Sequence, residues 1–336
     1  MPDLAVLVAK PDAEASIESL RAEGVYDDDR RVRERDDDRV ELPVLAAPAE
    51  TDVLATVEQT DPDYRSRGLD DLLRERGWSE AERERAPSSW AVVGDVLLAD
   101  FTDCPRPGEV ADALLTLHRE ADTVLDRGPV SGEFRTPTVT VLAGSGDTET
   151  VHVEHGTKYA LDLSRVMFSP GNQHERARMG DLAVEGERVL DMFAGIGYFA
   201  LPMARAGADV TAVEKNPDAF RYLAENAQLN EVSDSMNLVL GDCRDVETTA
   251  DRVVMGYYDA LDPDADYLAT ALDALAPGGT LHAHATVHET DLPDAPRERV
   301  EAAARNADRA VESVAVRRVK SHAEGVWHVV ADVRLA

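Results

Sequence analysis

The residues best suited to chemistry stand at the ends of predicted strands in the second half of the chain. In 191-DMFAGIGYFALP-202, Gly195 and Gly197 would let the backbone turn tightly and approach a ligand before a helix begins. Glu214 ends the next predicted strand, seventeen residues after Gly197, where a carboxylate could accept hydrogen bonds from both ribose hydroxyls of an adenosine. A third strand ends near Asp242, which could accept a proton from the adenine amino group. Together these placements predict an adenosine site.

The glycine turn also indicates which adenosine compound binds. It lacks the third glycine of the dinucleotide fingerprint, and Asp191 opens it. A carboxylate at this point suits the positive sulfonium and amino group of S-adenosylmethionine (SAM) better than a pyrophosphate. The sequence therefore predicts SAM as a co-substrate, and the alternative is an ordinary β–α turn with surface acids.

The upstream segment 168-FSPGNQHERARM-179 predicts a turn followed by a short helix. Ser169 and Arg176 could bind the methionine carboxylate of SAM, because a guanidinium forms two parallel hydrogen bonds with a carboxylate. The alternative is a Pro-Gly turn whose Arg176 and Arg178 form solvated ion pairs with Glu175. Spacing alone favours this second interpretation.

Cysteine and histidine placement gives no support for a metal site. Cys104 and Cys243 are the two cysteines and lie far apart, so neither a disulfide framework nor a thiolate site is indicated. His282 and His284 share one face of a predicted strand and His288 follows, but no cluster of carboxylates or cysteines accompanies them. We expect structural histidines and no metal.

The elements that would hold these residues alternate strictly between strand and helix from about residue 186. Such alternation builds a parallel sheet with helices on both faces, so the predicted class is α/β with a Rossmann-like, doubly wound sheet. The segments VAVRRVKS and VWHVVADVRL would add a terminal hairpin. Upstream, SWAVVGDVLLADF predicts one strand and residues 107–126 predict one helix.

Smaller α+β domains are predicted before this sheet. Residues 1–48 would form a small α+β lobe, 49–63 a linker, 64–165 a second α+β domain and 166–336 the SAM-binding domain. The first residues lack a basic leader, and no stretch of eighteen uncharged apolar residues follows. We therefore expect an untargeted, cytoplasmic protein without a membrane partner.

The net charge of −31, from 66 acidic and 35 basic residues, is spread along the chain. It indicates a surface adapted to concentrated salt, where screening removes the self-repulsion that such a charge would otherwise cause. A pI of 4.5 ordinarily argues against a nucleic-acid partner. At molar salt, however, counterion release contributes little to binding, so the charge does not exclude RNA.

An ordered set of segments from about residue 84 to the C-terminus resembles the family of archaeal and eukaryotic enzymes that modify the purine next to the tRNA anticodon. The resemblance is carried by PSSWAVVGDVLL, EHGTKYALDLSRVMFSPGNQHERARM, VLDMFAGIGYFALP, AVEKNPDAFRYLAENAQLN, GDCRD, DRVVMGY, LHAHATVHE and VKSHAEGVWHVVADV. It implies the class I SAM-dependent methyltransferase-like fold, a tRNA partner, and an RNA-interacting role for residues 64–165. With the charge, it also implies a salt-adapted archaeal host.

The resemblance further implies a role for each candidate binding residue. The turn from Asp191 to Gly197 would lie beneath the methionine end of SAM, and the segment at 168–179 would act as a lid. Cys243 would contribute through its backbone. The SAM contacts would fall on Ser169, Arg176, Glu214, Asp242 and Cys243.

One short turn distinguishes the two branches of this family. The tRNA guanine-37 N1-methyltransferase branch carries an Asn-x-Pro turn after DRVxM, where this chain reads Gly256-Tyr257-Tyr258. That difference, and FSPGN in place of FSPR, favours the tRNA 4-demethylwyosine aminocarboxypropyltransferase branch. This branch implies transfer of the 3-amino-3-carboxypropyl group of SAM to C7 of 4-demethylwyosine at position 37 of tRNA-Phe. The reaction releases 5′-methylthioadenosine and belongs to the biosynthesis of wybutosine derivatives.

Two alternatives stay open: N1-methylation of guanosine 37, and a non-catalytic tRNA-binding protein that keeps the fold. Gly256, Tyr257 and Tyr258 are the residues we expect beside the transferred carbon. Tyr257 or Tyr258 could stack on an extruded base, because RNA-modifying enzymes hold splayed bases on aromatic side chains. Ordinary packing of a strand end explains either tyrosine equally well.

Overall fold

The computed structural model describes residues 3–59, 62–63 and 68–336, and the chain divides into two compact units, Met1–Glu84 and Arg85–Ala336. The first unit holds an antiparallel sheet of order β2-β3-β1-β4. Helix α1 covers its apolar face, where Leu20 packs with Val6 and Leu42. The elements are β1 (Leu4–Ala9), α1 (Ala13–Ala22), β2 (Arg33–Glu34), β3 (Arg39–Val44) and β4 (Ala55–Glu58), followed by α2 (Leu69–Glu75) and α3 (Glu80–Arg83).

Strand β4 lies inside the segment predicted as a linker, because Ala55–Glu58 pairs with β1. Residues 60–61 of that segment, and residues 64–67 at the start of the next predicted domain, lie outside the described part of the chain. The predicted boundary at 63/64 therefore stays a prediction. The division between the two compact units falls later, after Glu84.

The second unit begins with a four-stranded sheet of order β5-β6-β7-β8 and a separate two-stranded hairpin. Strands β6 and β7 are parallel, so a helix must cross between them, and α4 does so. The elements are β5 (Trp90–Val93), β6 (Val96–Ala99), α4 (Pro107–Leu117), β7 (Thr123–Ser131), β8 (Thr136–Gly144), β9 (Glu149–Glu154) and β10 (Thr157–Asp162).

Two sequence-based expectations are wrong in this region. The single strand predicted for SWAVVGDVLLADF is two strands, because the chain reverses at Gly94, whose φ of +59° favours glycine. The helix predicted over 107–126 ends at Leu117. Thr123, Val124 and Leu125 instead join β6 as a buried strand, so tertiary pairing overrides their helical spacing.

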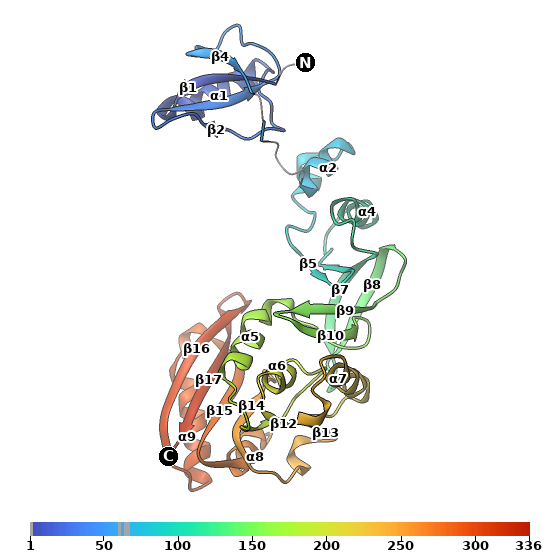
Figure 1. Ribbon diagram of the computed structural model, residues 1–336, viewed down its shortest axis with the longest axis vertical. Coiled ribbons are helices and arrows are strands. Elements are labelled where there is room, and N and C mark those ends of the chain that lie inside the picture. The colour runs from blue at the N-terminus through green and yellow to red at the C-terminus, as the bar shows by residue number, and fades with distance from the viewer. Residues whose placement is uncertain (1–2, 60–61, 64–67) are drawn as a thin grey trace. The chain divides into compact units, whose positions relative to one another are not determined.

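The largest sheet has seven strands in the order β13-β12-β11-β14-β15-β17-β16. The first five are parallel, and β17 runs antiparallel to both neighbours. In Figure 1, β13 lies near one edge and β16 at the other. The elements are α5 (Gln173–Leu182), β11 (Arg188–Asp191), α6 (Ala200–Arg205), β12 (Asp209–Glu214), α7 (Pro217–Leu229), β13 (Met236–Leu240), β14 (Ala250–Met255), α8 (Tyr267–Ala274), β15 (Leu275–His288), α9 (Asp294–Asn306), β16 (Val311–Ala323) and β17 (Val326–Leu335).

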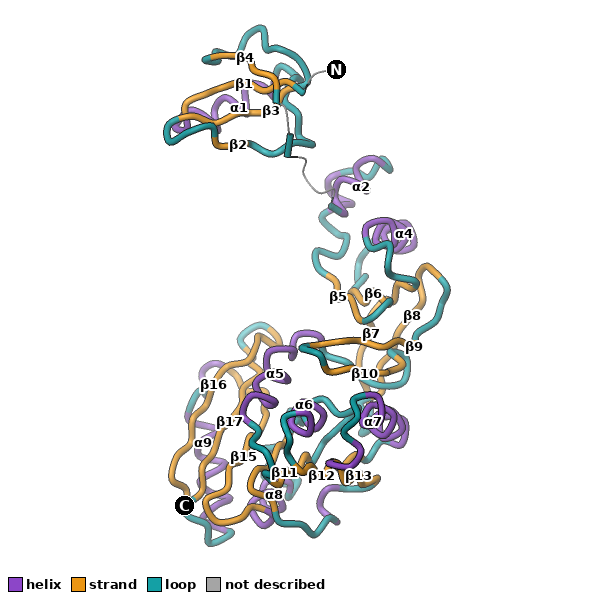
Figure 2. The backbone as a smooth tube through the Cα atoms, viewed as in Figure 1, coloured by secondary structure: helices purple, strands orange, loops and turns teal. Residues whose placement is uncertain are grey.

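Helices cover both faces of this sheet, as Figure 2 shows by secondary structure. Side chains alternate along a strand, so Val189 of β11 packs into one apolar core and Leu190 into the other. The first core contains residues of α5, α6 and α7, and the second contains residues of α8 and α9. The predicted doubly wound sheet with a terminal hairpin is therefore confirmed.

Helix length and hydropathy bear on the membrane question. Among the described residues, no helix is both long and apolar enough to span a lipid bilayer.

Candidate active site

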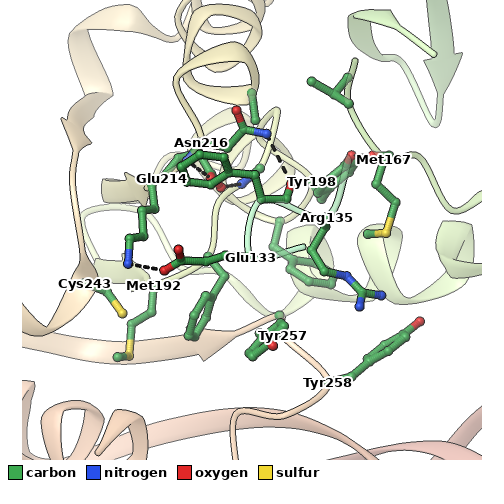
Figure 3. A pocket seen from close by; sticks show the side chains of 18 of the residues that line it. Glu133, Arg135, Met167, Met192, Tyr198, Glu214, Asn216, Cys243, Tyr257 and Tyr258 are labelled. Atoms are coloured by element: carbon green, nitrogen blue, oxygen red, sulfur yellow. Dashed lines mark hydrogen bonds and ion pairs between the residues drawn. The ribbon is translucent and has the colours of Figure 1, made fainter. Parts of the chain in front are cut away.

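A pocket opens at the carboxyl ends of β11, β12, β13 and β14, where a doubly wound sheet places its ligands (Figure 3). Three parts of the chain line it: the strand ends, residues 166–176, and the tip of the β7–β8 hairpin at residues 133–135. All three belong to the unit Arg85–Ala336. The pocket is therefore formed within that unit alone.

Nine of the eleven predicted site residues line this pocket. They are Ser169, Arg176, Gly195, Glu214, Asp242, Cys243, Gly256, Tyr257 and Tyr258. Asp191 and Gly197 are both buried and do not line it. The structure thus brings the predicted residues together, while the ligand that each one contacts stays a prediction.

The glycine turn needs glycine at two positions. Gly195 and Gly197 have φ values of +58° and +102°, a region that other residues rarely adopt. A Cβ on Gly195 would collide with the ring of Tyr198, and one on Gly197 would lie 2.6 Å from Leu201 Cγ. Backbone conformation and packing therefore both require glycine at positions 195 and 197. Without side chains there, the backbone of the turn can approach a ligand closely.

Glu214 at the end of β12 is held by two backbone donors. Its Oε2 accepts from the Gly195 N–H at 2.7 Å, and its Oε1 accepts from the Asn216 N–H at 2.6 Å. Burial raises the pKa of Glu214, and these backbone hydrogen bonds oppose that rise. Each carboxylate oxygen has a second lone pair, so one acceptor position on each remains for a ligand. This geometry suits a pair of neighbouring hydroxyls such as those of ribose.

Asp191 provides an unmatched acceptor beneath the turn. Its Oδ1 accepts from the Phe193 N–H at 3.3 Å, while its buried Oδ2 has no hydrogen-bond partner in the part of the chain that the structure describes. Burial, together with the charge of Glu214, raises the pKa of Asp191 to about 7. A positive group near the turn would stabilise the ionised form. The cationic end of SAM fits this requirement.

Asp242 follows β13 and is held by cations. Its Oδ1 accepts from the Arg244 backbone N–H at 3.0 Å, and its Oδ2 accepts from the Arg244 side chain at 2.7 Å and from Lys215 Nζ at 3.2 Å. The hydrogen bonds from Arg244 hold the pKa of Asp242 well below its usual range. Lys215 also pairs with Glu133 at the hairpin tip (Figure 3). Asp242 therefore stays ionised at neutral pH.

Cys243 lines the pocket but offers no reactive thiol. The residue is 4% exposed, and burial raises the pKa of its thiol to about 12. The thiol stays protonated at neutral pH, so a contact through the backbone, as the resemblance implies, is the one this environment allows.

Arg176 on α5 is already bound by the protein. Its Nε and Nη2 donate to the two carboxylate oxygens of Glu154 at 2.5 and 2.7 Å, and its Nη1 donates to the Ser169 carbonyl at 3.0 Å. Both charged side chains are 3% exposed. Arg176 therefore borders the pocket as a brace that holds the Ser169 turn against β9, with its carboxylate-binding fork occupied by Glu154.

A side chain at the first position of the turn after β14 would press against Phe199. A Cβ on Gly256 would lie 2.8 Å from Cε2 of Phe199, whose ring is buried and lines the pocket. Any larger side chain would have to displace that ring. An asparagine at this position does not fit the turn as it stands.

The two tyrosines of this turn belong to different surroundings. Tyr257 packs near Phe193, with ring centroids 5.3 Å apart, in an aromatic group that includes Tyr267. Tyr258 lies 4.7 Å from the ring of His328 and 5.3 Å from that of His322, both on the terminal hairpin. Figure 3 shows both tyrosines on one side of the pocket, away from Glu214. Either tyrosine could hold a planar base. Among the described ring contacts, those to the hairpin histidines are made by Tyr258 and not by Tyr257.

Two parts of the site were not found from the sequence. The β7–β8 hairpin tip brings Glu133, Phe134 and Arg135 to the pocket, and the Phe134 carbonyl accepts from Asn216 Nδ2 at 3.2 Å. Lys320 on β16 donates to Ser169 Oγ at 2.8 Å. No motif or spacing rule in the sequence indicated where the tip of this hairpin would lie.

The histidines of β15 form hydrogen bonds within the protein. His282 Nδ1 lies 2.5 Å from Asp332 Oδ1, His284 Nδ1 lies 2.9 Å from His328 Nε2, and His288 Nδ1 lies 2.8 Å from Thr290 Oγ1. Across residues 3–59, 62–63 and 68–336, no group of three or more His, Cys, Asp or Glu is placed to hold a metal ion. The expectation that no metal is needed stays a prediction.

The sheet order and the strand-end pocket together define a SAM-dependent transferase of the methyltransferase fold class. Family models match two adjoining regions: the TRM5/TYW2 methyltransferase domain over residues 150–312 and the TYW2 N-terminal domain over residues 69–148. The chain belongs to the TRM5/TYW2 family.

Individual relatives come from both branches of that family. The tRNA(Phe) (4-demethylwyosine(37)-C(7)) aminocarboxypropyltransferase of Pyrococcus horikoshii is 40% identical over 255 residues, which cover 74% of this chain and 90% of that protein. The structure of P. horikoshii TYW2 in complex with MeSAdo aligns with a TM-score of 0.68 at 37% identity, over 78% of this chain and 96% of that one. The structure of Trm5b from Pyrococcus abyssi gives 0.74 at 29% identity and covers 99% of each chain.

Proposed function

We propose that the protein transfers the 3-amino-3-carboxypropyl group of SAM to C7 of 4-demethylwyosine at position 37 of tRNA-Phe. The observation that carries the proposal is the turn after β14, where Phe199 occupies the space beside Gly256. The asparagine expected of the methyltransferase branch would require the ring of Phe199 to move from its position beside this turn. The P. horikoshii relative, whose name states this transfer, supports the same conclusion.

The reaction forms one carbon–carbon bond and breaks one carbon–sulfur bond. C7 of the base donates an electron pair to Cγ of the methionine chain, and the electrons of the Cγ–S bond return to sulfur. Neutral 5′-methylthioadenosine leaves, and the ring then loses its C7 proton to solvent. A sulfonium activates all three of its carbons, and the one that reacts lies in line with the nucleophile, about 3 to 3.5 Å away. The pocket therefore selects the product by orienting SAM.

The residues of the pocket suit that task at both ends of the co-substrate. Glu214 would hold the ribose hydroxyls and Asp242 the adenine amino group, while the glycine turn and Asp191 would lie beside the sulfonium and amino group. Ser169 would hold the carboxylate. Tyr257 and Tyr258 would contact the target base.

We also propose how the RNA presents the base and in what kind of cytoplasm the protein works. The base would be presented by the anticodon loop, extruded from its stack so that C7 reaches the pocket. The net charge of −31 supports a cytoplasm rich in salt, such as that of a halophilic archaeon. At that ionic strength, stacking and shape contribute more to RNA binding than phosphate attraction does.

The experiment is a nucleoside analysis of the RNA product. Protein, SAM and tRNA-Phe bearing 4-demethylwyosine are incubated in molar KCl, and the digested RNA is examined by mass spectrometry. We expect the tricyclic nucleoside to gain the mass of an aminocarboxypropyl group only when SAM and protein are both present. A gain of a methyl group on that nucleoside would overturn the proposal.

N1-methylation of guanosine 37 is the second candidate. It is favoured by the alignment with Trm5b, which extends over 99% of both chains and so includes the first compact unit. Its test is the same incubation with an unmodified tRNA transcript. Formation of 1-methylguanosine would establish this second activity.

A further inference from the structure

Lys320 is a half-buried cation for which the described part of the chain provides no carboxylate partner. It is one of four lysines in a chain with 66 acidic residues, and it lies on β16. Its Nζ donates to Ser169 Oγ at 2.8 Å, and no Asp or Glu within residues 3–59, 62–63 and 68–336 forms an ion pair with it. A partly buried charge is costly unless it is matched. An anion from outside the chain would match this one.

A β-bulge aims Lys320 at the pocket rim. Side chains alternate along a regular strand, so residues 317 and 320 would face opposite sides of β16. The register shifts between Arg318 and Lys320, which pair with consecutive residues of β17 although Val319 lies between them. Arg317 and Lys320 consequently reach the same segment, where they contact Glu175 and Ser169. Bulges beside active sites redirect side chains in this way.

The turn at 169–172 is shaped to admit the lysine. A Cβ on Gly171 would lie 3.2 Å from Lys320 Nζ and 3.3 Å from its Cδ, which is closer than side chains normally pack. Glycine at this position therefore lets the lysine side chain reach Ser169. The β-bulge at residues 318–320 and the glycine at position 171 therefore both favour the contact between Lys320 and Ser169.

The hydrogen bond from Lys320 determines whether the Ser169 hydroxyl donates or accepts toward a ligand. An ammonium group has donors and no acceptor, so Ser169 Oγ must accept from Lys320. The hydroxyl proton of Ser169 is left to donate, and among the described residues Ser169 Oγ is recorded only as the acceptor from Lys320. Because Ser169 lines the pocket, this donor is available to a ligand there.

Lys320 also supplies a positive charge beside Ser169 that no carboxylate among the described residues pairs with. Three arginines lie in the same region: Arg176 is paired with Glu154, Arg127 acts on Lys320 through its charge, and Arg135 lines the pocket. Burial lowers the pKa of Lys320, and the charges of Arg176 and Arg127 lower it further. Burial and neighbouring positive charge both disfavour the protonated lysine, and a bound anion would offset them.

We propose that Lys320 is a positioning residue for the amino-acid end of SAM: it holds Ser169 as a hydrogen-bond donor to the α-carboxylate and supplies the positive charge that the carboxylate needs. The inference rests on the proposed function only in taking SAM as the ligand. It adds a residue beyond position 312, outside both matched family regions. A tRNA phosphodiester is the other anion with suitable chemistry, and the experiment separates the two.

The experiment compares ligands that differ at the carboxylate. Calorimetry in molar KCl measures binding of SAM, decarboxylated SAM and 5′-methylthioadenosine to the wild-type chain and to Lys320→Met. Methionine keeps the length of the lysine side chain and removes its charge. We expect SAM affinity to fall roughly 10- to 100-fold, the range for a lost hydrogen bond to a charged group. Affinity for the two ligands without a carboxylate should stay unchanged.

Matched variants exclude a structural cause. Lys158→Met removes the same charge from an exposed position on β10 and should leave SAM affinity unchanged. Lys320→Arg, which keeps a charged donor, should retain most of the affinity. Ser169→Ala and Lys320→Met should cost less together than the sum of the two single losses, because they remove one interaction. Raising the pH through the lowered pKa of Lys320 should weaken SAM binding and leave 5′-methylthioadenosine binding unchanged.

Several outcomes would overturn the inference. An equal loss for all three ligands would mean that Lys320 only supports the fold. Unchanged SAM affinity with weakened tRNA binding would assign the lysine to a phosphodiester. Normal aminocarboxypropyl transfer with unchanged SAM affinity in Lys320→Met would refute the inference alone, whereas a wild-type chain that does not bind SAM would refute the proposed function as well.

Discussion

The two ends of the pocket are built in different ways. At the end where we propose that adenosine binds, backbone N–H groups at the ends of parallel strands hold the carboxylates: Glu214 accepts from Gly195 and Asn216, and Asp242 accepts from Arg244. At the end where we propose that the group is transferred, Ser169 Oγ accepts from Lys320, a side chain 151 residues away. The first end relies on backbone groups of the sheet's strand ends, and the second relies on a side chain from a strand distant in the chain. Binding of the co-substrate and choice of the transferred carbon should therefore respond separately to mutation.

The largest expected effect lies at the adenosine end, with Glu214→Ala. The change removes the acceptors that we propose for both ribose hydroxyls and leaves the Gly195 N–H and Asn216 N–H without their partner. Two lost hydrogen bonds to a charged group correspond to about 3 kcal/mol or more, a loss of over 100-fold in SAM affinity. Calorimetry measures it. Affinity within threefold of the wild-type value would mean that this end is not the anchor.

Asp191 should make the stability of the ligand-free protein depend on pH. Its carboxyl ionises near 4 when unfolded and near 7 when folded, so the folded state binds more protons between these values. Stability should therefore fall as pH rises through that window, by about 2 to 3 kcal/mol between pH 5 and pH 8.

Asp191→Asn is the isosteric control for that prediction. It should remove the pH dependence and make the ligand-free protein more stable at pH 8, while weakening SAM binding because the acceptor charge is lost. Urea unfolding at both pH values, with and without SAM, measures the two effects. An unchanged pH dependence would mean that Asp191 is not the titrating group.

Gly256→Asn tests the transfer end. The new side chain would collide with the ring of Phe199, and overpacking of this kind costs about 1 to 3 kcal/mol of stability. We expect a lower unfolding midpoint, loss of aminocarboxypropyl transfer, and SAM affinity closer to normal than in Glu214→Ala. The double change Gly256→Asn with Phe199→Ala should recover part of the stability. A fully stable single variant would contradict the steric account.

Tyr258→Leu has the smallest expected effect and should separate base binding from SAM binding. Loss of one stacked base costs about 1 to 3 kcal/mol, so the KM for tRNA should rise roughly tenfold while SAM affinity is unchanged. Tyr258→Phe keeps the ring and should behave almost as the wild type. Tyr257→Leu provides the matched comparison, because Tyr257 packs with Phe193 rather than with the hairpin histidines. Equal effects of the two leucine variants would mean that neither tyrosine has a special role.

The sequence predicted well that Gly195, Glu214 and Asp242 lie together at one pocket, because strand ends follow a periodic pattern. Glycines at 195 and 197 and acids at 214 and 242 follow strands whose alternation is visible in the chain, and parallel strands end at one edge. The transfer end had no such regularity. The β7–β8 hairpin tip reaches the pocket through tertiary packing, and the strand bulge that redirects Lys320 leaves no mark in the spacing of VKS.

Arg176 shows the limit of inference from residue type. The contact of Arg176 with a ligand carboxylate stays a prediction, and its residue type gave no sign that Nε and Nη2 also pair with Glu154. The helix predicted over 107–126 is wrong beyond Leu117, because β6 recruits Thr123 and its neighbours into a parallel pair. In that segment a distant partner, not the local pattern, decides the secondary structure.

The most direct test of the central claim is the sulfur product of a single turnover. Wild-type protein, SAM and tRNA-Phe bearing 4-demethylwyosine are mixed in molar KCl, and the adenosine thioethers are quantified by mass spectrometry. Orientation of Cγ toward the base predicts 5′-methylthioadenosine in an amount equal to the modified nucleoside. S-adenosylhomocysteine in its place would mean that the transfer end presents the methyl group, and would contradict the account.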